Sequence, residues 1–136
     1  MAGFLSGKYQ HQLDDRGRIR IPSKFKDILG KNPFVTLGTQ KCLVVYSKEN
    51  AERTLSEKFK DVDGLMPDPL LDPMRKMFSN GIFADEDKQG RITLQPYQIE
   101  YGDFKKNLVC IGLLNRVEIW SEECWDEYSK VINGKS

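Results

Sequence analysis

A short motif that occurs twice constrains the fold of this chain more than any other feature. Residues 14–19 and 87–92 share the pattern Asp-x-x-Gly-Arg-Ile at an offset of 73 positions. Residues 34–38 then match 108–112 at an offset of 74, and a third apolar block follows in both halves. Three blocks in the same order are typical of an internal duplication, which decides the architecture before any single element does. The sequence therefore predicts two related repeats.

Each repeat is expected to contain two strands around a tight turn. Residues 18–21 alternate arginine and isoleucine, the period of a strand with one buried face. Gly17 and Gly90 occupy the turn position that needs a positive φ, which glycine adopts without steric cost. Asp14 and Asp87 open the turns, where a carboxylate accepts backbone N–H groups. The pattern predicts strand, turn and strand, then a polar connection and a second pair of strands.

The composition between and after the repeats is typical of helices. Ser47 is placed to cap a helix to about residue 59, and Asp68 with Pro69 to begin another that ends at Ser79. Ser121 is placed to cap a last helix. The predicted organisation is repeat 1 at residues 7–50, a helical connector at 51–79, repeat 2 at 80–123, and a C-terminal helix with a short tail at 124–136.

A repeat of this size is too small to fold alone, because an isolated hairpin is marginally stable in water. We therefore expect the repeats to interleave as an intramolecular pseudo-dimer around one shared core, in a mainly β fold with helices (α+β). Eight aliphatic residues are predicted to form that core: Ile19, Ile21, Val35, Leu37, Ile92, Leu94, Val109 and Ile111. The three cysteines (Cys42, Cys110, Cys124) lack the spacing of a zinc site and are interpreted as small buried hydrophobic residues.

Charge is distributed unevenly although its total is small. The net charge is only +1, whereas domains that bind nucleic acid are usually clearly basic. Residues 7–26 hold six cations against two anions, a local charge of +4. The matching residues 80–103 hold two cations against five anions, a local charge of −3. The first repeat is therefore the stronger candidate for binding an anionic partner.

The residues around both motifs resemble the MraZ family. Residues 7–25 are similar to the opening of these proteins, residues 87–92 to their second Asp-x-x-Gly-Arg motif, and residues 112–121 to their last strands. The resemblance covers about residues 4–128 in one register. It implies a double swapped-hairpin, AbrB-like β-barrel and assembly into homo-oligomeric rings. It also implies a transcriptional regulator, usually a repressor, that binds short direct repeats in double-stranded DNA upstream of the operon for cell division and cell-wall synthesis.

Six cationic residues are the candidate DNA contacts. They are Arg16, Arg18, Arg20, Lys24, Lys88 and Arg91, whereas Asp14, Gly17, Asp87 and Gly90 are assigned to the turns themselves. Lysine and arginine make most phosphate contacts, and a two-stranded ribbon can enter the major groove. Two alternatives stay open. Arg18 and Arg91 could instead form structural ion pairs with aspartate, and the other cations could form an ordinary solvated face.

No enzyme motif is present, so we expect a protein that is not an enzyme. The chain lacks a phosphate-binding loop, a nucleophile elbow and an HExxH motif, and a pair between Cys42 and the single histidine, His11, is disfavoured. The acidic residues 85–87 are interpreted as solvated rather than as a Mg²⁺ site, so no metal, cofactor or small-molecule substrate is expected. Without a membrane-spanning stretch or signal peptide, a cytoplasmic, nucleoid-associated location is expected.

The alternative function is a protein-interaction module, an AbrB-like antitoxin or scaffold without specific DNA binding. Antitoxins of this kind commonly carry one hairpin domain and a disordered tail that wraps the toxin. Here both repeats are internal and only about eight residues follow Tyr128, which disfavours this alternative. The salt dependence of DNA binding separates the two functions, because contacts to phosphates release counterions.

Overall fold

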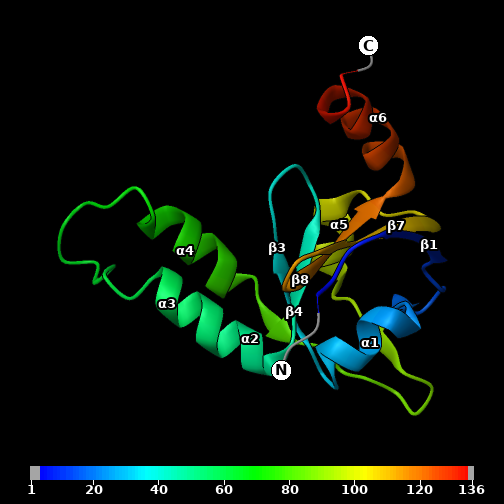
Figure 1. Ribbon diagram of the computed structural model, residues 1–136, viewed down its shortest axis with the longest axis horizontal. Helices are drawn as coiled ribbons and strands as arrows, with labels where there is room; N and C mark the ends of the chain where they lie inside the picture. Colours follow the sequence, from blue (N-terminus) through cyan, green and yellow to red (C-terminus); the bar gives the residue numbers. More distant parts are fainter. Residues whose placement is uncertain (1–3, 135–136) are drawn as a thin grey trace.

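The structure, a computed structural model, describes residues 4–134 as two antiparallel sheets with flanking helices (Figure 1). The strands are β1 (Lys8–Gln12), β2 (Arg18–Arg20), β3 (Phe34–Leu37), β4 (Leu43–Tyr46), β5 (Ile82–Phe83), β6 (Arg91–Thr93), β7 (Asn107–Leu113) and β8 (Arg116–Ser121). The helices are α1 (Ser23–Leu29), α2 (Lys48–Asn50), the π-helical η1 (Ala51–Leu55), α3 (Ser56–Lys58), α4 (Leu71–Ser79), α5 (Pro96–Gly102) and α6 (Glu122–Ile132). The predicted α+β class is confirmed.

Both sheets contain strands of the two repeats, and strands of one repeat pair with strands of the other in each sheet. The larger sheet has the order β1-β7-β8-β4-β3-β5, and the smaller one pairs β2 with β6. In register, Tyr9 of β1 lies opposite Cys110, and Ile19 of β2 lies opposite Ile92. The strands on either side of the first turn therefore pair with the second repeat and not with each other. This pairing agrees with interleaved repeats, while a closed barrel and a pseudo-dimer remain predictions.

Two apolar clusters stabilise the fold, where the sequence predicted one. Leu37 packs against the first cluster. Five more of the eight predicted core residues lie buried within it: Ile19, Ile21, Val35, Ile92 and Leu94. Val109 is buried in the second cluster with Trp120, and Ile111 packs against that cluster. Because successive side chains of a strand point to opposite faces, β7 contributes Leu108 and Cys110 to one cluster and Val109 to the other.

The sequence predicted Val109 in the same core as Val35, and the strand register explains why the two residues lie in different clusters. Val35 pairs with Val45, and Cys110 pairs with Ile119. Val45 and Ile119 are 74 positions apart, so the residue equivalent to Val35 is Cys110 at an offset of 75, not Val109. The sequence alignment of this strand is wrong by one residue, and a slip of one residue moves every side chain to the other face.

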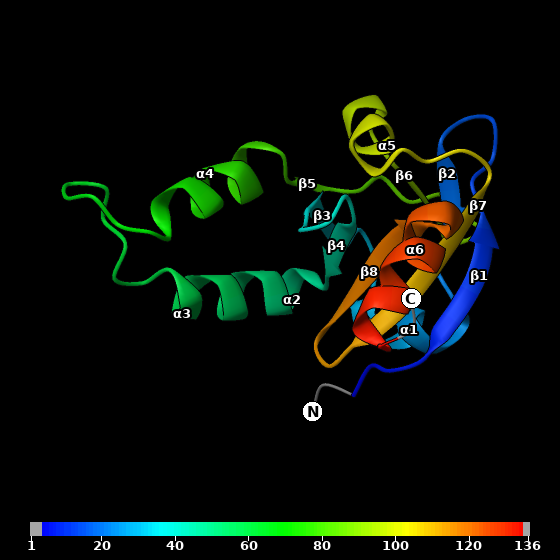
Figure 2. The ribbon, with the colours of Figure 1, turned by 90° about the horizontal axis from the view of Figure 1, so that it is seen from above.

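A pair of helical segments projects from the sheets. Ser47 caps the first segment, since its Oγ accepts the Asn50 N–H at 3.0 Å, and α2, η1 and α3 continue it to Lys58 as predicted. Figures 1 and 2 show α4 returning beside this segment, so that the two form an arm extending away from the strands. The predicted start of α4 at Asp68 is wrong. Asp68 accepts the Leu70 N–H in a turn, and the helix begins at Leu71.

Two short helices replace connections that were expected to be irregular. Helix α1 follows Pro22 without a side-chain cap, and α5 begins with a capping box between Gln95 and Gln98. Glutamine is not a favoured N-cap residue, so this signal is weak in the sequence. At the other end of the chain the prediction is confirmed, because the Ser121 Oγ accepts the Cys124 N–H at 3.0 Å and α6 follows.

Candidate nucleic-acid interface

The two motif turns have the same internal hydrogen bonds. In the first turn, Asp14 Oδ1 accepts the backbone N–H groups of Arg16 at 2.9 Å and Arg18 at 2.8 Å. In the second, Asp87 Oδ1 accepts those of Gln89 at 2.9 Å and Arg91 at 3.0 Å. Gly17 and Gly90 have φ values of 75° and 78°, as the turns require. The predicted roles of these aspartates and glycines in the turns agree with this geometry.

The motif arginines and aspartates form one cluster, which we call the aspartate–arginine clamp (Asp14, Arg18, Asp87 and Arg91). Within each turn, Arg18 Nε lies 2.8 Å from Asp14 Oδ2, and Arg91 Nε lies 2.7 Å from Asp87 Oδ2. Between the turns, Arg18 Nη1 lies 3.6 Å from Asp87 Oδ2, and Arg91 Nη1 lies 4.0 Å from Asp14 Oδ2. The pairing of β2 with β6 brings these four residues together across the repeats.

The hydrogen bonds of the clamp favour charged carboxylates. The N–H group of Arg18 is the main cause that lowers the pKa of Asp14 below its usual 3.8, and the guanidinium group of Arg18 adds to this effect. The N–H group and guanidinium group of Arg91 lower the pKa of Asp87 in the same way. Both carboxylates are therefore anionic at neutral pH, and each balances one arginine.

Four of the six candidate cations stand outside the clamp. Arg16, Arg20, Lys24 and Lys88 are exposed, and within residues 4–134 no carboxylate lies at ion-pairing distance from any of them. Arg20 lies opposite Arg91 on the β2–β6 ribbon. The pKa of His11 is lowered by the partial burial of its own side chain and by the nearby positive charge of Arg20. The Lys24 Nζ lies 6.0 Å from the centre of the Tyr9 ring.

The acidic segment of the second repeat contacts cations of the first repeat. Glu86 forms an ion pair with Lys26 and accepts the Asn32 N–H at 3.1 Å, and its side chain is only 7% exposed. Asp87 belongs to the clamp. Lys26 was counted among the basic residues, but its charge is thus balanced. Sequence reasoning missed this ion pair, because no local pattern links residues 26 and 86.

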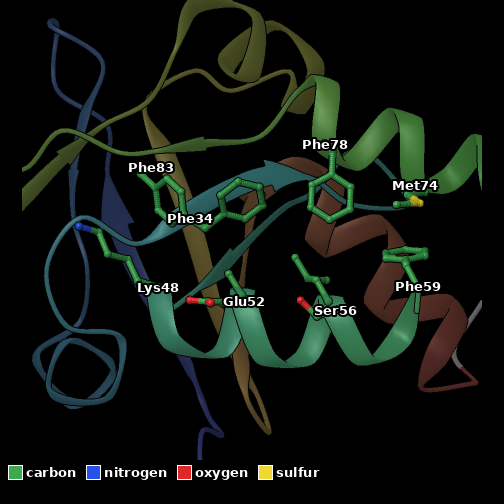
Figure 3. Close-up of a pocket in the computed structure, with 10 residues that line it drawn as sticks. Phe34, Lys48, Glu52, Ser56, Phe59, Met74, Phe78 and Phe83 are labelled. Atoms are coloured by element: carbon green, nitrogen blue, oxygen red, sulfur yellow. The ribbon is translucent and has the colours of Figure 1, made fainter. Parts of the chain in front are cut away.

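An apolar groove lies in the helical arm, away from the turns. It has a volume of about 590 Å³ and lies between the α2–η1–α3 segment and α4. Figure 3 shows Phe34, Phe78, Phe83 and Met74 on one side, facing the helix that carries Phe59. Lys48 and Glu52, from the α2–η1–α3 segment, also line the groove.

The burial of Cys42 and Cys110 does not favour nucleophilic chemistry at these two thiols. Burial raises the pKa of the Cys42 thiol, and the charge of Glu118 raises it further. Burial also raises the pKa of Cys110 to about 12. A thiol of this kind stays protonated at neutral pH, and the thiolate is the nucleophilic form. In residues 4–134 no group of three or more histidine, cysteine or acidic side chains is arranged to hold a metal ion.

The fold and the clamp define the class of the protein: a duplicated, mainly antiparallel chain whose two aspartate–arginine turns meet between the repeats. A sequence model of the family described as "MraZ protein, putative antitoxin-like" matches residues 4–63 and again residues 77–136. This chain belongs to the MraZ family.

Similar proteins carry the name transcriptional regulator MraZ. The chain is 37% identical to that of Caldanaerobacter subterraneus subsp. tengcongensis, over 93% of this chain and 87% of the relative. It is 38% identical to that of Natranaerobius thermophilus over the same shares. It is 36% identical to that of Dictyoglomus thermophilum, over 93% of this chain and 86% of the relative.

None of the helices within residues 4–134 combines the length and the apolar character that crossing a bilayer requires.

Proposed function

We propose that this chain is a sequence-specific DNA-binding transcriptional regulator, and a repressor of its own operon for cell division and cell-wall synthesis. It acts in the cytoplasm at the nucleoid. The proposed DNA contacts are Arg16, Arg18, Arg20, Lys24, Lys88 and Arg91. Membership of a family whose members are named transcriptional regulators supports this function. The observation that carries it is the group of exposed cations around the two linked turns, for which the described part of the chain offers no carboxylate at ion-pairing distance.

The proposed contacts divide into two kinds. Arg16, Arg20, Lys24 and Lys88 are exposed, so their charges are available to phosphates. Arg18 is held by two carboxylates but keeps 23% of its side chain exposed. An arginine held in this way offers its remaining N–H groups to a phosphate or a guanine in a fixed orientation. The β2–β6 ribbon is the element that would approach the major groove.

We further propose that the regulator works as a homo-oligomeric ring on short direct repeats. A net charge of +1 gives one copy only a weak hold on DNA. Several linked copies that meet several repeats in phase raise the avidity by about 10²–10⁴. Light scattering is expected to find a complex well above the 15.7 kDa of one chain. A strict monomer would contradict the ring.

The test of the function is a salt series of DNA binding. The probe is a labelled duplex from the region upstream of the gene that encodes this chain, compared with a shuffled duplex of equal length. Each phosphate contact lowers the slope of log affinity against log salt by about 0.9, so the specific duplex should give a steep negative slope. Equal affinity for both duplexes would contradict specificity.

The interaction module remains the second candidate, since the family description includes the term antitoxin-like. It predicts no binding to either duplex even in low salt, and a stable complex with a protein partner instead. The same salt series therefore decides between the two functions.

A further inference from the structure

We infer that Asp14 and Asp87 are positioning residues that join the two turns into a single DNA-binding surface. The inference rests on the proposed function and adds a role for two anions within a surface that binds an anion. In this arrangement the second repeat contributes to binding through Asp87 even where its own cations are few.

Each carboxylate of the clamp uses its two oxygens for different purposes. The Oδ1 atom of Asp87 binds the backbone of its own turn. Its Oδ2 atom lies 2.7 Å from Nε of Arg91 and 3.6 Å from Nη1 of Arg18, so it links guanidinium groups of both repeats. Asp14 repeats this arrangement, with distances of 2.8 Å to Arg18 and 4.0 Å to Arg91. The two turns are thus linked by two ion pairs, both longer than a hydrogen bond.

The clamp also decides which side of each arginine is available. The Nε atoms of Arg18 and Arg91 donate hydrogen bonds to the carboxylates, and their Nη1 atoms lie 3.6 Å and 4.0 Å from the carboxylate of the other turn. Within residues 4–134 neither Nη2 atom donates a hydrogen bond to another residue. The side chains remain 23% and 28% exposed. A side chain that is already ordered loses less entropy when it binds, so the clamp prepares Nη2 to donate to DNA.

The same contacts balance part of the negative charge of the second repeat. Two of its anions, Glu86 and Asp87, pair with Lys26 and Arg18 of the first repeat. Their charges are balanced inside the protein and orient cations, instead of lying free opposite the phosphates.

The experiment compares the change Asp87→Asn with the matched change Asp15→Asn. Both remove one negative charge from a motif turn, but Asp15 is exposed and within residues 4–134 has no ion-pair partner. Simple electrostatics predicts tighter DNA binding for both variants. The clamp predicts that Asp15→Asn binds the upstream duplex about twofold more tightly. It predicts that Asp87→Asn loses about tenfold, the order of one charge-assisted hydrogen bond, because Arg18 is no longer held.

The shuffled duplex provides a second readout that a general loss of folding would not produce. The Asp87→Asn protein should bind the shuffled duplex slightly more tightly and the upstream duplex less tightly than the unchanged protein. The ratio of the two affinities, which measures specificity, therefore falls. Thermal melting checks that the variant is folded, and Asp14→Asn repeats the test if Asp87→Asn is not. Tighter binding of the upstream duplex by a folded Asp87→Asn protein would overturn the inference.

A thermal double-mutant cycle between Arg18→Ala and Asp87→Asn separates this inference from the proposed function. If the unchanged protein binds neither duplex, the proposed function fails. The clamp would still be supported if the double variant loses less melting temperature than the sum of the losses of the two single variants. Losses that simply add would overturn it.

Discussion

Arg18 and Arg20 lie only two positions apart, yet they have different surroundings because only the first has carboxylate partners among residues 4–134. Strand alternation predicts Arg18 and Arg20 on the same face, and Ile19 between them is fully buried. Of these two arginines, Arg18 forms ion pairs with Asp14 and Asp87, whereas Arg20 is exposed. The sequence left two readings of Arg18 open, and the structure places it in ion pairs. Its contact with DNA remains a proposal.

Substitution of Arg20 should separate binding from stability. We expect Arg20→Ala to weaken binding of the upstream duplex and to reduce the magnitude of the salt slope by about one, the value for one phosphate contact. The free energy of unfolding should change by less than about 0.5 kcal/mol, because the side chain is exposed. Fluorescence anisotropy and urea unfolding measure the two effects. An unchanged salt slope would remove Arg20 from the proposed contacts.

The clamp should make folding sensitive to acid. Because the pKa of Asp14 and Asp87 is lowered in the folded chain, their contribution to stability is present above the usual value of 3.8. It is lost as the pH falls below 3.8 through the lower folded-state pKa. We therefore expect the urea midpoint of the unchanged protein to fall more between pH 5 and pH 2.5 than that of Asp14→Asn. Equal losses in both proteins would contradict this prediction.

At the scale of elements, the two turns have the same backbone but different surroundings. A Cβ atom at Gly17 would lie 3.2 Å from Ile99 and 3.3 Å from the carbonyl oxygen of Leu94. A Cβ atom at Gly90 would meet only the Lys26 side chain, at 4.0 Å. The first turn packs tightly against the start of α5, while the second has space beside α1. Although the two motifs share the same glycine, a side chain at that position is therefore accommodated less easily in the first turn than in the second.

Alanine substitutions of the two turn glycines should rank by this difference. Both variants force a non-glycine residue into a positive φ, at a cost of about 1–2 kcal/mol each. Gly17→Ala should cost more than Gly90→Ala, since Ile99 and the Leu94 carbonyl must also move. Urea unfolding of the two variants measures the ranking. A larger loss for Gly90→Ala would show that the first turn relaxes easily.

The fold depends on both repeats at the scale of the whole molecule. β2 has its partner in the second repeat, β5 has its partner in the first, and β1 pairs with β7. Both apolar clusters contain residues from each half of the chain. Neither repeat alone could pair these strands or bury these surfaces. The loop of the helical arm is the place where the chain crosses from one half to the other (Figure 2).

A chain divided in the arm loop should fold only when its halves are combined. We expect fragments 1–64 and 65–136 to lack cooperative thermal unfolding separately, because each leaves strands without partners. An equimolar mixture should recover a cooperative transition and the circular dichroism of the intact chain. A fragment that unfolds cooperatively by itself would contradict the interdependence of the repeats.

The local patterns of the sequence were sufficient for features that depend on near neighbours. The turns at Gly17 and Gly90 and the caps at Ser47 and Ser121 are of this kind, because a positive φ or a serine cap involves residues only a few positions apart. The duplication was also visible, because it repeats residue types in a fixed order.

Only the tertiary structure decided how the repeats combine. The exchange of strand partners, the face on which Val109 lies and the contact of Arg18 with Asp87 depend on register and on residues far apart in the chain. A change of one residue in a loop shifts the register and moves side chains to the other face, and nothing in the local sequence reports this. Near-neighbour chemistry was therefore readable from the chain, and long-range pairing was not.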